Sequence, residues 1–368
     1  MAETITVEAL RERLEKGEKL TVLDVRDRDD YAEWRIPGAL HCDAYEDLAA
    51  GRAGPVATVE VPLDRPVVTV CYAGVTSAVA ADALRARGLD AVSLAGGMNA
   101  WTAAWNSADI AMPGSTTRVV QLRRTGKGCL SYIVVSDGEA AVIDPSLDAS
   151  VYVELARKNG WRLAHVVETH VHADHLSRGR ALWAAVGSKL HLPRTSRVAF
   201  PYEPVDEGTR IAVGRTELVA MRTPGHTHES TCYQLEGRLL FTGDTLFLDA
   251  VGRPDLEADV HEAKARAVAL HGSLQRILRL PAGTLVAPCH VGAPVPFDRR
   301  PLVAELRQVR ARTPMLSLAR DEFVDRLTQR LPPPPPNHHA IVKANEAGEA
   351  PWSDAPKLEA GANRCAVR

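Results

Sequence analysis

The chain has 368 residues, of which 45% are hydrophobic and 24% are charged. This length suits two domains with sizeable cores and excludes a single small module, a fibrous repeat and a disordered chain. Lys and Arg number 44 against 46 Asp and Glu, and no long run of one sign occurs, so we expect no nucleic-acid or membrane partner.

The six cysteines lie far apart in the sequence, which excludes a CxxC redox or zinc pair and does not suggest a disulfide scaffold. The first residues are charged and amphipathic, and nowhere does an apolar run reach the roughly 18 residues that a membrane span requires. We therefore expect a cytoplasmic protein with reduced thiols. Composition is compatible with a monomer or a homo-oligomer.

The first part of the chain alternates β-branched runs with helical patterns. Residues 21–25 and 67–71 are predicted strands, and residues 76–88 are a predicted helix that ends at a glycine. This alternation predicts a small α/β domain with a parallel sheet over residues 1–110. The Met-Pro-Gly-Ser segment that follows predicts a linker over residues 110–116.

From residue 116 the pattern changes to short strands with helices between some of them. The predicted strands are residues 132–135, 140–143, 165–168, 217–221, 239–241 and 284–287. The predicted helices are residues 150–159, 175–186 and 261–278. We expect this second domain to cover residues 116–345, with an extended proline run at 332–336. After this run we expect a docking strip and a loose tail, with residues 346–368 as the C-terminal tail.

Cys71 begins a tight turn between a predicted strand and an alanine-rich helix, in the segment CYAGVTS. Backbone N–H groups curled around the sulfur at a helix N-terminus favour an anion, so this turn would lower the pKa of the thiol and stabilise a persulfide on it. A buried structural cysteine at the end of a strand explains the local sequence equally well.

Four segments of the first domain resemble the rhodanese family: LDVR at 23–26, YAEWRIPGALH at 31–41, CYAGVTS at 71–77 and LAGGMNAWTAAW at 94–105. The resemblance implies a sulfurtransferase in which Cys71 carries sulfane sulfur as a persulfide. The loop lacks the Arg or Lys of many thiosulfate-using members, and Val75 and Thr76 are similar to the mercaptopyruvate type. The donor, thiosulfate or another sulfane-sulfur compound, is left open.

Histidine and aspartate residues gather in the second domain in one cluster and three single positions. The cluster is THVHADHL at 169–176, directly after a predicted strand, and the single positions each follow another predicted strand. Ligands of this type suit zinc, iron or manganese. The seven candidate metal ligands are His170, His172, Asp174, His175, His226, Asp244 and His290. Within the cluster, Asp174 and His175 are expected to open a helix.

The segments TPGHT at 223–227, FTGDTLF at 241–247 and VGRPDL at 251–256, together with the histidine cluster, resemble the metallo-β-lactamase superfamily. The resemblance implies an αββα sandwich with metal at the strand ends. Within the superfamily, these segments are similar to the branch that contains hydroxyacylglutathione hydrolases and persulfide dioxygenases.

The resemblance leaves two activities. In a persulfide dioxygenase, His170, His226 and Asp244 would hold one Fe(II), at which a thiol persulfide reacts with O₂ to give sulfite. The surrounding residues would be His172, Asp174, His175 and His290. In a hydrolase, all seven residues would hold two zinc ions for attack of water on a thioester, with Asp244 bridging. The first domain favours the dioxygenase, because a sulfurtransferase supplies or consumes persulfides.

Two departures from the best-understood dioxygenases lie near the expected substrate side. The loop after Asp244 lacks the GCGRTD form, and Val291 and Gly292 follow His290 where Asp and Tyr are typical, so the thiol carrier is left open. We expect Arg253 to hold this loop or to bind a substrate carboxylate, with a solvated arginine as the alternative.

Overall fold

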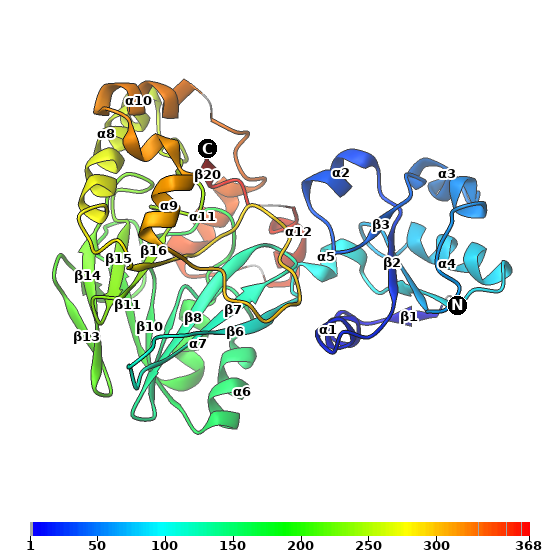
Figure 1. Cartoon of the computed structure of the whole chain (residues 1–368), viewed down its shortest axis with the longest axis horizontal. Coiled ribbons are helices and arrows are strands. Elements are labelled where there is room, and N and C mark those ends of the chain that lie inside the picture. The colour runs from blue at the N-terminus through cyan, green and yellow to red at the C-terminus, as the bar shows by residue number, and fades with distance from the viewer. Residues whose placement is uncertain (1–2, 330, 351, 362) are drawn as a thin grey trace.

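The computed structural model describes residues 3–329, 331–350, 352–361 and 363–368, which form two domains side by side (Figure 1). The first domain is blue to cyan in the figure, and the second runs from cyan through green and yellow to red. None of the helices in these ranges has the length and hydrophobicity needed to cross a bilayer.

The first domain is built on a parallel sheet with the strand order β1-β5-β4-β2-β3. Its strands are β1 (Thr4–Ile5), β2 (Thr21–Asp24), β3 (Leu40–His41), β4 (Val67–Val70) and β5 (Ala91–Leu94). Every residue of β2 and β4 is buried, as expected for parallel strands covered on both faces. The predicted α/β domain with a parallel sheet is confirmed.

Helices cover both faces of this sheet. They are α1 (Val7–Glu15), α2 (Arg28–Glu33), α3 (Tyr45–Ala49), η1 (Gly54–Ala57), α4 (Thr76–Ala86) and α5 (Gly97–Trp101). One apolar cluster packs α3 and α4 on the sheet, and a second packs α1 and α5 on the other face. Cys71 lies between the end of β4 and the start of α4.

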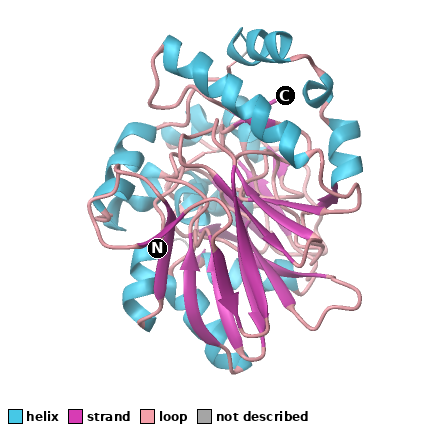
Figure 2. Cartoon of the chain, turned by 90° about the vertical axis from the view of Figure 1, so that its left-hand side faces the viewer, coloured by secondary structure: helices cyan, strands magenta, loops and turns pink. Residues whose placement is uncertain are grey.

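The second domain contains two sheets packed face to face, which Figure 2 shows from the side. The seven-stranded sheet consists of β6 (Asn106–Ile110), β7 (Arg118–Arg124), β8 (Cys129–Ser136), β9 (Glu139–Ile143), β10 (Arg162–Val167), β11 (Lys189–Pro193) and β12 (Glu203–Val205). The six-stranded sheet consists of β13 (Arg210–Val213), β14 (Thr216–Arg222), β15 (Thr231–Leu235), β16 (Leu239–Gly243), β18 (Leu285–Pro288) and β19 (Ala304–Glu305). A short pair joins β17 (Val251–Gly252) to β20 (Ala366–Val367).

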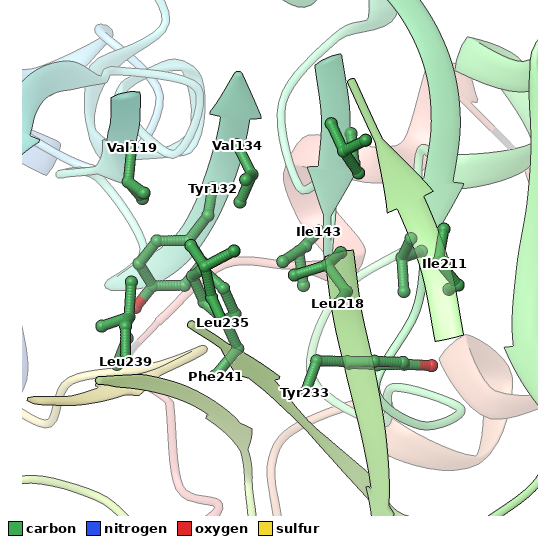
Figure 3. Close-up of a cluster of buried hydrophobic side chains, with 14 of the residues drawn as sticks. Val119, Tyr132, Val134, Ile143, Ile211, Leu218, Tyr233, Leu235, Leu239 and Phe241 are labelled. Atoms are coloured by element: carbon green, nitrogen blue, oxygen red, sulfur yellow. The ribbon is translucent and has the colours of Figure 1, made fainter. Parts of the chain in front are cut away.

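Side chains point alternately to the two faces of each strand, and this alternation determines which residues enter the core between the sheets. In β8, Tyr132 and Val134 face the other sheet, where Leu235 and Phe241 meet them (Figure 3). Ile133 and Val135, one position on, face the helices on the outside. Because both faces of β8 are covered, all of its residues are buried.

Helices flank the two sheets and complete the expected αββα sandwich. They are α6 (Ala149–Asn159), α7 (Gly179–Val186), α8 (Val260–Ile277), α9 (Leu306–Arg312), η2 (Pro314–Ser317), α10 (Arg320–Gln329), α11 (His338–Ala347), η3 (Trp352–Asp354) and α12 (Ala355–Leu358). Side-chain caps start the longer ones: Asp148 accepts from Ser150 N before α6, and Asp259 accepts from His261 N before α8. Apolar clusters join α6 and α7 to one sheet and α8 and α10 to the other.

The expected boundary between the domains is wrong by several residues. Residues 106–110 form β6, which pairs antiparallel with β7, so they belong to the second domain. The predicted linker at 110–116 is therefore largely the connection between these two strands. The chain crosses between domains just after α5, where Arg124 Nε donates to the Thr102 carbonyl at 2.6 Å.

Two further expectations are corrected. The predicted helix at 175–186 begins only at Gly179, so Asp174 and His175 lie in a loop. The expected loose tail at 346–368 contains α12 and β20, and Glu359 and Cys365 within it are buried. Arg364 also reaches the first domain, where its Nε lies 3.0 Å from Glu33 Oε1. The described part of the tail is thus integral to the fold.

Candidate functional site

The predicted ligands meet at one edge of the sandwich. The cluster at 170–175 follows β10 of one sheet, whereas His226, Asp244 and His290 follow β14, β16 and β18 of the other. All seven side chains are buried, with exposures of 1–2%. Gly243, at φ +50°, brings the two sheets together here, since a Cβ would lie 2.5 Å from Thr169 Oγ1.

His170, His226 and Asp244 form the predicted triad. Asp244 Oδ2 lies 3.8 Å from His170 Nε2 and 3.5 Å from His226 Nε2. Metal bonds to nitrogen and oxygen are about 2 Å long, so this spacing matches ligands of one ion. His170 Nε2 and Asp244 Oδ2 are buried without a hydrogen bond, a costly arrangement that a metal ion would relieve.

The opposite ring atoms of the triad histidines are held by the protein. His226 Nδ1 donates to the Arg253 carbonyl at 2.8 Å. His170 Nδ1 lies 2.9 Å from Thr169 Oγ1, which donates to Asp144 Oδ2 at 2.9 Å. Partners of this kind orient the ring and leave the Nε2 lone pair free for a metal.

The protonation states also suit metal binding. Burial, together with the neighbouring His172, lowers the pKa of His170 well below its usual value, and burial lowers the pKa of His226. Burial opposes ionisation of Asp244, yet His290 and the two triad histidines lower the pKa of its carboxyl. Neutral imidazoles and an ionised carboxylate are the forms that bind metal ions.

The other four predicted ligands lie beside the triad. His172 turns its Nε2 towards Glu168 Oε2 at 3.1 Å and leaves its Nδ1 without a partner. Asp174, His175 and His290 form a separate group with Cys129, in which one ligand atom of each residue lies within 4.8 Å of the others. The metal-ligand search by sequence overlooked Cys129, because nothing in its local sequence resembles a ligand motif.

Two thiols at this site differ in their surroundings. Burial acts against ionisation of Cys129, but the charge of His175 lowers the pKa of the thiol to about 6. Burial and the charge of Asp244 raise the pKa of Cys289 to about 12. Cys289 accordingly stays protonated and donates to Asp244 Oδ1 at 2.9 Å.

Residues near the C-terminus form hydrogen bonds with the ligand loop at 170–176. The sequence did not reveal these contacts. Asn345 Nδ2 donates to the carbonyls of His172 and His175 at 2.8 and 2.9 Å. Glu359 accepts from Leu176 N at 2.6 Å and forms ion pairs with Arg124 and Arg178. No motif marks Asn345 or Glu359, since their role depends on contacts with residues that are distant in the sequence.

Arg253 is buried, with only 1% of its surface exposed. Its guanidinium has five N–H groups, and five hydrogen bonds join it to Asp255 and to the carbonyls of Pro332, Pro333 and Arg364. No donor remains for a substrate carboxylate, so the geometry favours the loop-holding role over the substrate-binding and solvated alternatives.

The cysteine loop of the first domain surrounds a buried sulfur. Cys71 Sγ accepts from Gly74 N at 3.2 Å and lies 3.1 Å from Ser77 Oγ, which in turn lies 2.8 Å from Ser93 Oγ. Burial alone would raise the pKa of the thiol, but hydrogen bonding in the loop, with the Ser77 hydroxyl first, outweighs it and lowers the pKa. This environment is that of an activated sulfur nucleophile.

A cavity of about 310 Å³ opens beside His290. Val291 and Gly292, two residues that depart from the expected pattern, line it together with Arg312, Asn363 and Arg368. Of the seven predicted ligands, His290 lines this cavity.

Comparisons with known proteins agree with this division. Residues 6–104 match the rhodanese-like domain, and residues 124–290 match the metallo-beta-lactamase superfamily. The persulfide dioxygenase ETHE1 of Bos taurus is 30% identical over 205 residues, which are 54% of this chain and 76% of that protein. A hydroxyacylglutathione hydrolase of Polaromonas sp. is 39% identical over 158 residues, which are 42% of this chain but only 57% of that protein.

Solved structures show the same fold. A metallo-beta-lactamase from Staphylococcus aureus is 26% identical with a TM-score of 0.58, covering 64% of this chain and 74% of that one. ETHE1 from Myxococcus xanthus is 28% identical with a TM-score of 0.55, covering 64% of this chain and 100% of that one.

Proposed function

The chain belongs to the metallo-β-lactamase superfamily, with a rhodanese-like domain before the metal-binding fold, and we propose that it is a persulfide dioxygenase. His170, His226 and Asp244 would hold a single Fe(II). The substrate would be a low-molecular-weight thiol persulfide, and the products would be the free thiol and sulfite.

One observation carries this proposal. Only one oxygen of Asp244 faces the triad, because Oδ1 accepts hydrogen bonds from His290 Nδ1 at 2.7 Å and from Cys289 at 2.9 Å. If two metals were bridged by both oxygens of this carboxylate, Oδ1 would have to give up these hydrogen bonds. An arrangement with two histidines and one carboxylate oxygen on one ion is typical of non-haem iron oxygenases.

Fe(II) bound by this triad would supply open coordination positions and the redox chemistry with O₂. In the overall reaction, the S–S bond breaks and the outer sulfur leaves as sulfite with both oxygen atoms of O₂ and one from water. The inner sulfur becomes the thiol, O₂ is the electron acceptor, and two protons are released. The chain's own residues orient the triad and keep its histidines neutral.

Cys71 would act separately as the sulfurtransferase. Its thiolate attacks a sulfane-sulfur donor such as thiosulfate, breaks the S–S bond, releases sulfite and becomes a persulfide. A small thiol then takes the outer sulfur, and the resulting thiol persulfide diffuses to the iron site. The hydrogen bonds around Cys71 favour the anionic sulfur that both steps require.

A di-metal hydroxyacylglutathione hydrolase is the second candidate, since relatives with that name reach 39% identity over their shared segment. The ETHE1 relative, by contrast, is covered over 76% of its length. A sulfurtransferase domain also has a direct use for a persulfide and none for a thioester. These two points favour the dioxygenase.

Oxygen uptake tests the choice. Protein reloaded with Fe(II) under anaerobic conditions should consume O₂ and form sulfite when given glutathione persulfide or the persulfide of another small thiol. The zinc-loaded protein should not hydrolyse S-lactoylglutathione. Absence of uptake with every persulfide, combined with rapid thioester hydrolysis, would reverse the assignment.

A further inference from the structure

We propose that Cys129 supplies a thiolate ligand to a second metal position beside the iron triad, which Asp174, His175 and His290 complete. The donor set is one sulfur, one oxygen and two nitrogens. Such a set suits a four-coordinate, borderline-soft divalent cation, and Zn²⁺ is the ion that prefers it. This position goes beyond the proposed activity and does not depend on it.

The four ligand atoms converge in a buried space. Each lies within 4.8 Å of the other three, and the residues are 0–2% exposed. Zinc bonds of about 2.0–2.3 Å place tetrahedral ligand atoms about 3–4 Å apart, so small adjustments bring these four onto one ion.

Unpartnered atoms point to the same place. His290 Nε2 and Asp174 Oδ2 lie 2.8 Å apart, yet neither makes a hydrogen bond of ordinary geometry, and His175 Nε2 also has none. The opposite ring atoms are held, because His175 Nδ1 contacts Asp174 Oδ1 at 3.0 Å and His290 Nδ1 contacts Asp244 Oδ1 at 2.7 Å. The Nε2 atom of each ring is thus left free for a metal.

The backbone places Cys129 there rigidly. Cys129 forms an isolated β-bridge with His290, flanked by Leu130 N donating to the Cys289 carbonyl at 2.7 Å and Val291 N donating to the Gly128 carbonyl at 3.0 Å. Gly128 adopts φ +90°, and a Cβ there would lie 2.8 Å from the Val291 oxygen. The close approach of these two segments therefore requires glycine.

Asp244 and Cys289 are engaged differently from Cys129. Asp244 Oδ2 faces the triad, and its Oδ1 accepts from His290 and Cys289. Asp244 and Cys289 form a group of possible ligands with His290, whereas Cys129 forms one with Asp174, His175 and His290 together. The group with Cys129 supplies four ligand atoms, as a closed zinc site requires.

The two positions would then have different roles. The triad leaves coordination sites open, whereas four protein ligands close the second position, as in structural zinc sites. Binding uses the thiolate of Cys129 and unprotonated nitrogens of His175 and His290, so any proton on these groups passes to solvent, and the ion would tie β8, the ligand loop and the loop after β18 together. The second ion would stabilise the strands and loops that position the triad.

Zinc-edge X-ray absorption of the full-length protein, loaded first with Fe(II) and then with one equivalent of Zn²⁺, tests the proposal. We expect one sulfur neighbour at about 2.3 Å. In Cys129→Ser this neighbour should disappear, and zinc affinity should fall by at least about 100-fold, since loss of an outer-sphere partner already costs about 10–100-fold. Replacing Zn²⁺ with Co²⁺ should give a sulfur-to-cobalt charge-transfer band that the same variant lacks.

Two matched variants complete the design. Cys289→Ser should retain the sulfur neighbour and the cobalt band, and His226→Ala should retain both while losing iron. A zinc shell without sulfur in the wild type, or loss of sulfur in Cys289→Ser but not in Cys129→Ser, would overturn the proposal. Because the wild-type spectrum is informative without any variant, a folding defect cannot mimic either result, and oxygen uptake remains a separate measurement.

Discussion

The Nδ1 atom of His226 lies 2.8 Å from the backbone carbonyl oxygen of Arg253. A carbonyl only accepts hydrogen bonds, so Nδ1 carries the proton and Nε2 keeps its lone pair for a metal. The guanidinium of the same Arg253 binds the carbonyls of Pro332, Pro333 and Arg364. The orientation of a metal ligand therefore depends on a segment near the C-terminus.

Arg253→Lys should weaken both folding and metal binding. A lysine keeps the charge but cannot reproduce the planar fork, so buried carbonyls lose their donors, and we expect the free energy of unfolding to fall by about 1–3 kcal/mol. Loosening of His226 should reduce iron affinity by about 10–100-fold. Urea unfolding and iron content per chain measure the two effects.

Arg194→Lys is the matched control, because Arg194 pairs with Asp206 on the surface, where both side chains are largely exposed. It should change neither quantity. If Arg253→Lys also leaves both unchanged, the arginine does not hold this loop.

Cys71→Ser and His226→Ala should separate the two activities. The serine variant should lose sulfur transfer from thiosulfate to a small thiol, because it removes the nucleophile, but should oxidise added thiol persulfide at nearly the wild-type rate. The alanine variant should lose oxygen uptake and keep sulfur transfer. Circular dichroism serves as the folding check for each variant.

Oxygen uptake with thiosulfate plus thiol, compared with uptake on ready-made persulfide, tests how the sites cooperate. Cys71→Ser should abolish the first and spare the second, since the carrier diffuses between domains. Equal loss of both in a well-folded variant would instead indicate direct transfer from Cys71 to the metal site.

The thiol of Cys71 should react as a thiolate at lower pH than an ordinary cysteine. Its pKa is lowered because hydrogen bonds from the Ser77 hydroxyl and the loop backbone outweigh burial, so the anion persists as the pH falls below the usual range. The pH profile of iodoacetamide labelling, followed by mass spectrometry of the Cys71 peptide, measures this pKa.

Ser77→Ala should move that profile to higher pH, because its hydroxyl lies 3.1 Å from the sulfur. Ser93→Ala removes a hydroxyl that contacts the Ser77 hydroxyl at 2.8 Å and donates to the Gly74 carbonyl at 3.5 Å, and it should produce a smaller change in the same direction. An unchanged profile in Ser77→Ala would show that the backbone N–H groups alone stabilise the thiolate.

Glu359→Gln should destabilise the second domain strongly. Glu359 is fully buried between Arg124 and Arg178, and removal of its charge leaves two buried cations, which costs about 3–5 kcal/mol. Thermal or urea unfolding measures the loss. Asp206→Asn, which breaks an exposed ion pair, should leave stability unchanged.

The effect of Glu359 should depend on pH in a definite direction. Burial opposes its ionisation, but Arg124 and Arg178 lower its pKa below the ordinary 4.5. Its contribution is therefore complete above pH 4.5 and is lost as the pH falls towards the lowered value. The stability difference between wild type and Glu359→Gln should shrink in acid and stay constant near neutral pH.

Local patterns in the sequence determined the two fold types and the candidate ligands. Strands such as β4 and β9 are short β-branched runs whose preference needs no distant partner, and HxHxDH carries its spacing within a few residues. Cys71, His170, His226 and Asp244 could be named for the same reason, because each lies in a motif directly after a predicted strand.

Only the tertiary structure decided what depends on distant pairing. The sequence assigns residues 106–110 to the first domain, whereas their pairing with β7 places them in the second. The segment that carries Glu359 resembles a tail in the sequence, although Arg124 and Arg178 surround this carboxylate in the structure. Cys129 and Asn345 contact the metal-ligand group through chain segments that no local pattern connects. Such contacts arise when separate sheets and loops pack together, so their signal lies in three-dimensional proximity and not in spacing along the chain.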